Sequence, residues 1–437
     1  MTVPSANVFN AADLKKLKVF LMGEIARELE ANPPALNDRR TAIINIIHQV
    51  LSSRRINLPG TLIEQLTHDI LDDILGLGPL QPLLDDPDIS EIMVNARDKV
   101  YIERKGVLTK TNIIFENDEQ ILHLIDTIIL PLGRRIDPDS PMVDARLPDG
   151  SRVNAAIPPV TIDGPSITIR KFMKDKLSVQ QMIDFGTLTQ NMADFIRACV
   201  IARLNILISG GTGSGKTTLL NVLSSYIPES ERIITIEDAA ELRLQQDHVL
   251  RMETKSANAE GHNAVTIRDL VRNSLRMRPD RIVVGEVRGG EALDMLQAMN
   301  TGHDGTLTTL HANTPRDAIS RLETLILMAG VDFPVKVIRT QIASAMDLVI
   351  QLSRLKGGER KVTSIAEISG MEGDTVVMTE IFKFEQTGVS PDGKALGELR
   401  PTGIRPLFTP RLEAAGFKLG PEVFGAKLQN ILAQGRR

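Results

Sequence analysis

The sequence predicts an α/β protein whose main domain has a mostly parallel sheet covered by helices on both faces. Short apolar runs typical of buried strands alternate with stretches of helical spacing, an alternation typical of parallel sheets. The strands are expected at 204–208, 232–236, 281–285 and 306–310, and the helices at about 265–277, 289–300 and 315–328. The first strand enters a glycine-rich turn that continues as a helix. The length of 437 residues exceeds one ordinary core, so we expect further domains.

Breaks in the pattern divide the chain into four parts. Apolar residues recur at helical spacing over 11–29 and 39–51, and again after Pro59, which predicts a small helical module. Short strand-like runs then replace the helices. The expected parts are an N-terminal helical module at 1–75, an α+β domain at 76–172, a linker at 173–187, and an α/β domain with a C-terminal appendage at 188–437.

The α+β domain contains a hairpin signal and a set of arginines. Its strands are expected at 91–95, 99–103, 107–109, 143–147, 151–157 and 167–172, with a helix at 120–128. Pro148-Asp149-Gly150 predicts the turn of a hairpin. Arg146, Arg152 and Arg170 alternate with apolar residues on these strands. They either point to solvent or form a guanidinium cluster that faces phosphates, since arginine suits bidentate oxygen contacts.

Composition narrows the classes of function. The net charge is −4, with 24% charged and 42% hydrophobic residues, so no global basic field attracts nucleic acid and no direct nucleic-acid contact is expected. The single cysteine, Cys199, sits in an apolar helical stretch and is expected to be a buried thiol. No apolar run approaches 18 residues. These features favour a cytoplasmic protein whose membrane association is indirect, through partners.

The glycine-rich turn carries the strongest functional signal. Residues 210–217 have the spacing G-x-x-x-x-G-K-T between a strand and a helix, which predicts a loop that binds a nucleoside triphosphate. Lys216 is expected to reach the outer phosphates and Thr217 to ligate magnesium. A turn that merely closed a strand–helix corner would not require these two residues. The expected nucleotide-binding residues are Gly211, Thr212, Gly213, Ser214, Gly215, Lys216, Thr217 and Thr218.

Two of the later strands end in acids. The strand at 232–236 leads into Glu237 and the strand at 281–285 leads into Glu286, where α/β folds place ligands. A magnesium–phosphate site needs acids to hold the metal's water shell and to orient or deprotonate the attacking water. We assign Glu286 to the water and Glu237 to the metal shell. The alternative is that either glutamate caps the following helix.

Two histidines bracket the strand at 306–310. His303 and His311 are eight residues apart, not at the i, i+4 spacing of a helical metal pair. Neutral imidazoles beside a nucleotide suit phosphate sensing or a water network. Either histidine taken by itself also fits a structural hydrogen bond.

The motifs together resemble a known family. The loop at 210–217, T-I-E-D-A-A-E-L at 235–242, R-P-D-R-I-V-V-G-E-V-R at 278–288, and G-H-D-G followed by T-L-H-A-N within 302–313 look like the Walker A, Asp box, atypical Walker B and His box of the secretion ATPase superfamily. These are the motors of type II and type IV secretion and of type IV pili. The resemblance runs from about residue 70 to 350. Within it, P-M-V-D-A-R-L-P-D-G-S-R-V-N at 141–154 is most similar to the CpaF-like branch of tight-adherence pilus ATPases.

The resemblance implies a fold and a set of partners. It implies a homohexamer, a RecA-like P-loop motor domain, and a PAS-like α+β domain that folds over the nucleotide. It also implies ATP and Mg²⁺ as cofactors, and phosphate contacts from the arginines, for which Arg152 matches best, then Arg170, then Arg146. The four-cysteine zinc insertion of some relatives is missing from the sequence, so no metal besides magnesium is expected.

The resulting hypothesis is a cytoplasmic hexameric ATPase motor, peripheral to the inner membrane. Its hydrolysis cycle would move the two domains and drive assembly or retraction of a tight-adherence (type IVc) pilus through an inner-membrane platform protein. One alternative is a type IV secretion ATPase that translocates substrates, and another is a nucleotide-gated assembly scaffold with little turnover. Beyond residue 350 we expect paired strands at 347–352 and 362–368, a strand at 376–384, a loop at 386–393 and a short helical tail.

Overall fold

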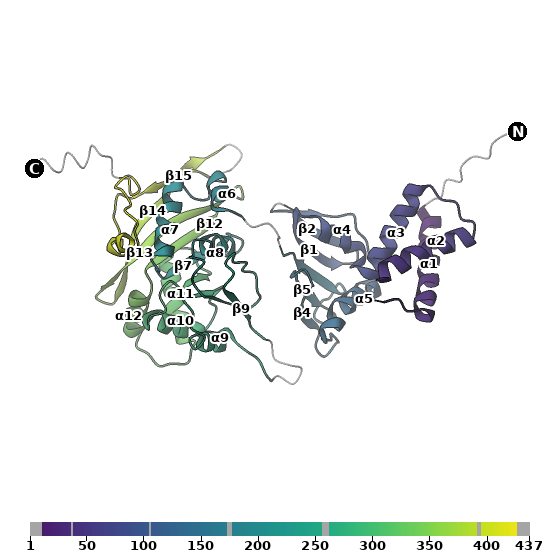
Figure 1. Cartoon of the computed structure of the whole chain (residues 1–437), viewed down its shortest axis with the longest axis horizontal. Coiled ribbons are helices and arrows are strands. Elements are labelled where there is room, and N and C mark those ends of the chain that lie inside the picture. The colour runs from purple at the N-terminus through teal and green to yellow at the C-terminus, as the bar shows by residue number, and fades with distance from the viewer. Residues whose placement is uncertain are drawn as a thin grey trace, which may run out of the picture. The chain divides into compact units, whose positions relative to one another are not determined.

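The chain forms two compact units, Met1–Lys174 and Asp175–Arg437, in the computed structural model (Figure 1). The structure describes residues 11–35, 38–104, 106–172, 177–255, 262–390 and 395–425. Each unit has its own hydrophobic cores, so each is considered by itself. None of the described helices is both long and apolar enough to cross a lipid bilayer.

The first unit begins with the predicted helical module. Its helices are α1 (Ala11–Ala31), α2 (Arg39–Ser53) and α3 (Gly60–Leu75). Each helix presents an apolar stripe at helical spacing to the other two. Their shared core consists of Leu21, Ile25, Ile43, Ile47, Leu51, Leu66, Ile70 and Leu71. Burial of each such side chain contributes about 1.5–3 kcal/mol, so the module holds together through its own core.

The rest of the first unit is an antiparallel sheet with a helix packed on it. A short turn, η2 (Gly78–Leu80), and helix α4 (Gln81–Asp85) lead into the sheet, and α5 (Asp118–Ile129) and η3 (Leu130–Leu132) follow its first three strands. The strands are β1 (Ile89–Ala96), β2 (Lys99–Arg104), β3 (Val107–Lys110), β4 (Met142–Arg146), β5 (Arg152–Ala156) and β6 (Ser166–Arg170). Their order is β3-β2-β1-β6-β5-β4. The α+β architecture expected here is confirmed, including the β4–β5 hairpin.

The described part of the second unit forms a nine-stranded sheet in the order β15-β14-β13-β12-β7-β11-β10-β8-β9. The strands from β12 to β9 in this order pair in parallel, and β12 to β15 pair antiparallel. The strands are β7 (Ile206–Gly210), β8 (Ile233–Glu237), β9 (Val249–Glu253), β10 (Arg281–Val284), β11 (Leu307–Leu310), β12 (Leu348–Arg354), β13 (Arg360–Glu372), β14 (Thr375–Val389) and β15 (Ala395–Pro401).

Helices cover both faces of this sheet, as the strand–helix alternation predicts (Figure 1). The helices are α6 (Val179–Asp184), α7 (Gln190–Ile201), α8 (Lys216–Ser224), α9 (Ile267–Ser274), α10 (Glu291–Asn300), α11 (Pro315–Leu327), α12 (Val335–Ala345) and α13 (Thr409–Ala414). One core lies between the sheet and α6, α7 and α8, and the other between the sheet and α9 to α12. In β7, Ile206 and Ile208 enter the first core and Leu207 the second, because side chains alternate along a strand.

Three segments differ from the expectations. The stretch expected as a linker at 173–187 contains α6, whose capping box is formed by Ser178 and Gln181 and whose Met182 is buried in the core. The loop expected at 386–393 is strand as far as Val389, because this end of β14 pairs with β15; residues 391–394 lie outside the described residues. The tail expected to be helical contains β15 before α13, and residues 426–437 are likewise not described.

Ion pairs and hydrogen bonds join distant segments at the amino edge of the parallel strands. The fully buried Arg281 donates to Glu231 at 2.5 Å and to the Val200 carbonyl at 2.7 Å. Asn205 accepts from two backbone N–H groups before β11, and its own N–H donates to Asp347. Burial raises the pKa of Asp347, although a hydrogen bond from Asn205 and the nearby Arg411 oppose the shift. This edge is therefore held by paired polar groups.

Candidate active site

The phosphate loop joins β7 to α8 with the predicted strand–loop–helix geometry. Gly213 and Gly215 adopt φ angles of +69° and +97°, a region that glycine enters without steric cost. Gly215 is also the N-cap of α8 and supplies no side-chain cap. The first-turn N–H groups, which include those of Thr217 and Thr218, therefore have no capping side chain at an end of the helix that favours anions. This arrangement suits a phosphate group.

Lys216 is folded back onto the loop that precedes it. Its ammonium group donates to the carbonyls of Gly210 and Gly211 at 3.1 and 3.2 Å, and it lies 3.3 Å from Nε2 of His311. The residue is 7% exposed. A largely buried ammonium that spans the loop is a strong point charge for the outer phosphates of a nucleotide.

Glu286 follows β10 at the carboxyl edge of the sheet, next to the lysine and the histidine. Its Oε1 lies 2.8 Å from Nε2 of His311, but not in hydrogen-bond geometry, so this buried oxygen has no hydrogen-bond partner among the described residues. Its Oε2 accepts from Arg288. Burial lowers the pKa of His311, although the charge of Glu286 opposes the shift, so the imidazole is neutral at pH 7. The structure therefore brings together three of the predicted residues, Lys216, Glu286 and His311.

Glu237 is the last residue of β8 and is 3% exposed. Its Oε1 accepts from the N–H groups of Glu241 and Leu242 at 2.8 and 2.9 Å. Burial raises the pKa of Glu237 to about 7, although these two hydrogen bonds oppose the shift. Its Oε2 is buried and has no hydrogen-bond partner among the described residues. An acid with one unused oxygen suits the water shell of a cation.

The donor set fits magnesium better than a metal that needs a cage of protein ligands. The described residues include no group of three or more histidines, cysteines or acids that could hold a metal ion. Magnesium bound with a nucleotide keeps several waters and takes few protein ligands. The Thr217 hydroxyl and Oε2 of Glu237 are donors of the required kind.

The histidines differ in their position. His303 precedes β11 and His311 follows it, and a strand of four residues spans about 13 Å. The N–H of His303 donates to Ala298, and its carbonyl accepts from Thr306. The structure thus places His303 at the amino edge of the sheet and brings only the other histidine to the phosphate loop. The expectation of two histidines beside the nucleotide is corrected, because the strand between them crosses the sheet.

The three predicted arginines form a row on the first unit. Arg146 pairs with Arg152 across β4 and β5, and Arg152 pairs with Arg170 across β5 and β6. Directly paired residues lie on the same face of a sheet, so the guanidinium groups share one face. Glu91 of β1 continues the row and lies 3.7 Å from Nε of Arg170. The arginines therefore form a cross-strand row, and their contact with phosphates stays a prediction.

Two further arginines at the site were not predicted. Arg288 contacts Glu286, and Arg360 of β13 donates to the Gly213 carbonyl at 2.9 Å. Arg288 lies within the motif at 278–288, and its place two residues after the glutamate was an available signal. Arg360 is almost 150 residues from the loop it contacts, and no local pattern in the sequence indicates the contact.

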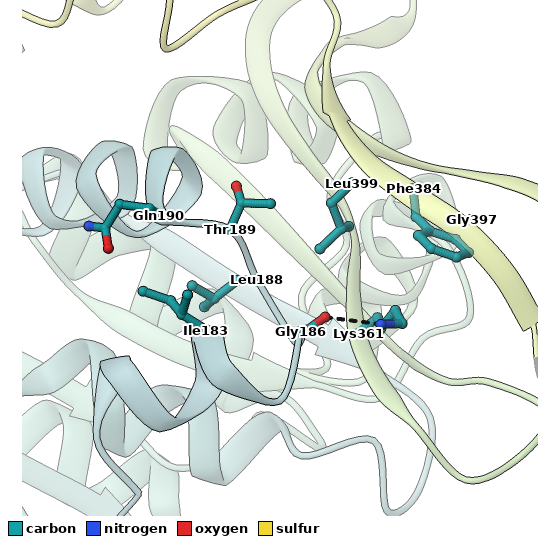
Figure 2. Close-up of a pocket in the computed structure, with 9 residues that line it drawn as sticks. All are labelled: Ile183, Gly186, Leu188, Thr189, Gln190, Lys361, Phe384, Gly397 and Leu399. Carbon is teal, nitrogen blue, oxygen red and sulfur yellow. Dashed lines mark hydrogen bonds between the residues drawn. The ribbon is translucent and has the colours of Figure 1, made fainter.

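A separate hollow of about 370 Å³ lies on the second unit, near the start of β13. Figure 2 shows Lys361 donating to the Gly186 carbonyl, beside the apolar side chains of Ile183 and Leu188. Its lining residues are Ile183, Gly186, Leu188, Thr189, Gln190, Lys361, Phe384, Gly397 and Leu399. Since the lining includes no acid, histidine or cysteine, the hollow offers no group for hydrolysis.

Comparison with known proteins shows the family of the chain. Residues 73–382 match the family model described as type II/IV secretion system protein. The chain belongs to this family. A putative conjugal transfer protein of Mycobacterium tuberculosis is 35% identical over 333 residues, which cover 75% of this chain and 94% of the relative. The type IV secretion system protein PtlH of Bordetella pertussis is 36% identical over 320 residues, which cover 66% of this chain and 93% of PtlH.

The chain is also similar to a protein of known structure. The crystal structure of the VirB11 ATPase from the Brucella suis type IV secretion system, in complex with sulphate, is 29% identical, covers 66% of this chain and 94% of that protein, and has a TM-score of 0.36. The present chain, as a member of the type II/IV secretion family, is an ATPase. Its cofactor is therefore a nucleotide.

Proposed function

We propose that this chain is a homohexameric ATPase motor at the cytoplasmic face of the inner membrane, and that it drives a type IV secretion machine through an inner-membrane platform protein. The observation that carries the proposal is the convergence of Lys216, His311 and Glu286 beside the phosphate loop at one edge of a sheet. These groups are suited to bind a polyphosphate and to activate water beside it.

The site residues have different roles in hydrolysis. The loop N–H groups, the N-terminus of α8 and Lys216 bind the phosphates, so that charge developing on them in the transition state is stabilised. Glu286 orients the attacking water and accepts its proton. Neutral His311 lies between the lysine and this acid, where it suits a water network that senses the phosphate.

Magnesium would be held by Thr217 and, through its water shell, by Glu237. The ion would neutralise charge on the phosphate oxygens. Glu237 then has a second task, because its other oxygen fixes the turn at 239–242. We therefore expect substitutions of Glu237 to affect both cation binding and the shape of this turn.

The arginine row supports a role for the first unit in the cycle. Three guanidinium groups on one face form a surface that suits phosphate oxygens, and in this proposal a PAS-like domain brings them to the nucleotide on a RecA-like motor domain. Arg152 is the central member of the row. Loss of the γ-phosphate would weaken the binding of these arginines to the nucleotide.

The names of the relatives favour a type IV secretion machine over a pilus motor. The M. tuberculosis relative is named as a conjugal transfer protein and PtlH as a type IV secretion protein, which supports substrate translocation. The net charge of −4 favours a motor that acts through protein partners rather than by contacting nucleic acid. A tight-adherence (type IVc) pilus motor is the second candidate, favoured by the similarity of residues 141–154, which form the β4–β5 hairpin, to the CpaF-like branch.

The first experiment measures ATP hydrolysis by the full chain, with magnesium, for the wild type and Glu286→Gln. We expect the variant to bind ATP and to lose turnover by about 10²- to 10⁴-fold, because it lacks the proton acceptor. Glu398→Gln, an exposed acid on β15, is the matched control and should retain full turnover. Equal turnover in Glu286→Gln would refute the role of this residue.

The second experiment varies the protein concentration. If assembly into a ring completes the site, the rate of hydrolysis per chain should rise with protein concentration and then reach a plateau. At the plateau the measured molecular mass should be that of a hexamer. Absence of turnover at every concentration would favour the nucleotide-gated assembly scaffold.

A third experiment compares surface pili and exported substrates in cells of the source organism that carry Glu286→Gln. Loss of export with normal pili supports translocation, and the reverse supports the pilus motor.

A further inference from the structure

Arg288 lies closer to the proposed catalytic acid, Glu286, than any of the site residues predicted from the sequence. Its Nε and Nη2 donate to Oε2 of Glu286 at 2.7 and 2.5 Å. Its Nη1 lies 3.6 Å from Oδ2 of Asp238, which follows the end of β8. The guanidinium therefore bridges the acids that follow two neighbouring strands of the sheet.

The backbone around Arg288 is fixed. The N–H groups of Arg288 and Gly289 donate to Oε1 of Glu291 at 2.6 and 2.8 Å. The N–H of Val287 donates to the carbonyl of Thr309 in β11. Two anchors thus hold the segment that carries Arg288, so its guanidinium is presented to Glu286 from a defined position.

The two oxygens of Glu286 have different surroundings. Arg288 holds Oε2, whereas Oε1 is buried and has no hydrogen-bond partner among the described residues. The imidazole of His311 lies beside Oε1. One oxygen is therefore restrained, and the other retains its capacity to accept a hydrogen bond.

We propose that Arg288 is a positioning residue for hydrolysis, which holds Oε2 of Glu286 so that Oε1 meets the attacking water. Asp238 supports the guanidinium from the other side. The inference rests on the role proposed above for Glu286. Arg288 acts through this acid and does not touch the nucleotide. Misplacement of a reacting group by about 1 Å can cost about 100-fold in rate, which sets the scale of the expected effect.

Arginine also binds phosphate oxygens directly, and a double-mutant cycle separates the two roles. If Arg288 acts only through Glu286, its removal has no further effect once the acid is replaced by glutamine. If it binds the nucleotide, its removal weakens nucleotide affinity and slows the residual reaction in either background. Lysine at position 288 is informative because it keeps the charge but lacks the planar fork.

The experiment uses the full chain with Arg288→Ala, Arg288→Lys, Glu286→Gln and the double variant Glu286→Gln/Arg288→Ala. We expect Arg288→Ala to lower kcat by about 10- to 100-fold, with KM and the Kd of a non-hydrolysable ATP analogue within about twofold of wild type. Arg288→Lys should recover only part of kcat. The double variant should match Glu286→Gln in both turnover and analogue binding.

Arg400→Ala is the matched control. Arg400 of β15 also donates through Nε and Nη2 to a glutamate two residues earlier, Glu398, on an exposed part of the strand. It should keep wild-type kcat. Thermal unfolding of each variant checks the fold, and Arg288→Lys decides the question if the alanine variant unfolds.

Four results would overturn the inference. An unchanged kcat in Arg288→Ala, while Glu286→Gln is inactive, removes the positioning role and leaves the proposed function intact. Weaker analogue binding, or an additional loss of turnover in the double variant, assigns Arg288 to the nucleotide. Full turnover in Glu286→Gln refutes the proposed role of the acid itself, and this inference with it.

Discussion

Replacement of Glu237 by glutamine tests whether this residue supports the water shell of magnesium. The test measures the pH dependence of magnesium–nucleotide binding and the number of protons released on binding. The pKa of Glu237 is about 7, so about half of the chains carry a proton on it at pH 7, about 90% at pH 6 and about 10% at pH 8. A carboxylate that supports the water shell of magnesium must be ionised. Binding of the magnesium–nucleotide complex should therefore release this proton, and acid should weaken binding.

The magnitude follows from the pKa. For a group that must lose its proton, the apparent Kd rises by about 11-fold at pH 6 and by only about 1.1-fold at pH 8. Wild-type affinity should thus fall about tenfold, or about 1.4 kcal/mol, between pH 8 and pH 6 relative to Glu237→Gln, which has no proton to lose. At pH 7 the wild type should release about half a proton more than the variant.

Isothermal titration calorimetry with magnesium and a non-hydrolysable ATP analogue measures both quantities. Titrations at pH 6, 7 and 8, in buffers of different ionisation enthalpy, give Kd and the number of protons released. Titration of the nucleotide itself is common to both proteins and cancels in the comparison. Glu398→Gln should behave as wild type. Parallel pH dependences in wild type and Glu237→Gln would refute the reasoning, since Glu237 would then keep one protonation state throughout.

Two further predictions concern stability and the phosphate loop. Arg281→Ala should lower the free energy of unfolding by about 2–4 kcal/mol in chemical denaturation of the full chain, because it leaves Arg203 as the sole ion-pair partner of Glu231, removes the hydrogen bond to the Val200 carbonyl and opens a cavity. Arg400→Ala, which breaks an exposed ion pair, should leave the free energy of unfolding close to that of the wild type, and similar losses in the two variants would contradict this account. Arg360→Ala should raise the Kd for ATP by about fivefold, since loss of one hydrogen bond to Gly213 loosens the loop by about 1 kcal/mol, and an unchanged Kd would exclude this support.

The phosphate loop and its acids were predictable because their positions follow from chain direction. Parallel strands end at one edge of a sheet, so Glu237 and Glu286 meet there whatever the details of packing. The β4–β5 hairpin was predictable from its turn residues. The hairpin turn at 148–150 fixes the register that places Arg146 opposite Arg152.

The features that were not predicted, or were predicted wrongly, depend on how distant parts of the chain pack together. His303 is close to His311 in sequence, but the strand between them passes from one edge of the sheet to the other. The contact between Arg360 and the phosphate loop depends on where β13 packs in the folded sheet, which no local pattern records. Helix α6 was missed because its six residues are too few to display a period, and tertiary packing of Met182 stabilises it.

The order of the strands has a consequence for synthesis of the chain. β7 carries the phosphate loop, yet its neighbours in the sheet are β11 and β12, which follow about 100 and 142 residues later. At translation rates of about 5–20 residues per second, synthesis of the 142 residues that separate β7 from β12 takes about 7–28 seconds. Until β11 and β12 have been synthesised, the apolar side chains of β7 lack the two strands that flank them in the sheet, so the nascent segment exposes an apolar surface. The phosphate loop is thus synthesised early, but β7, which leads into it, gains its last neighbouring strand only when β12 folds beside it.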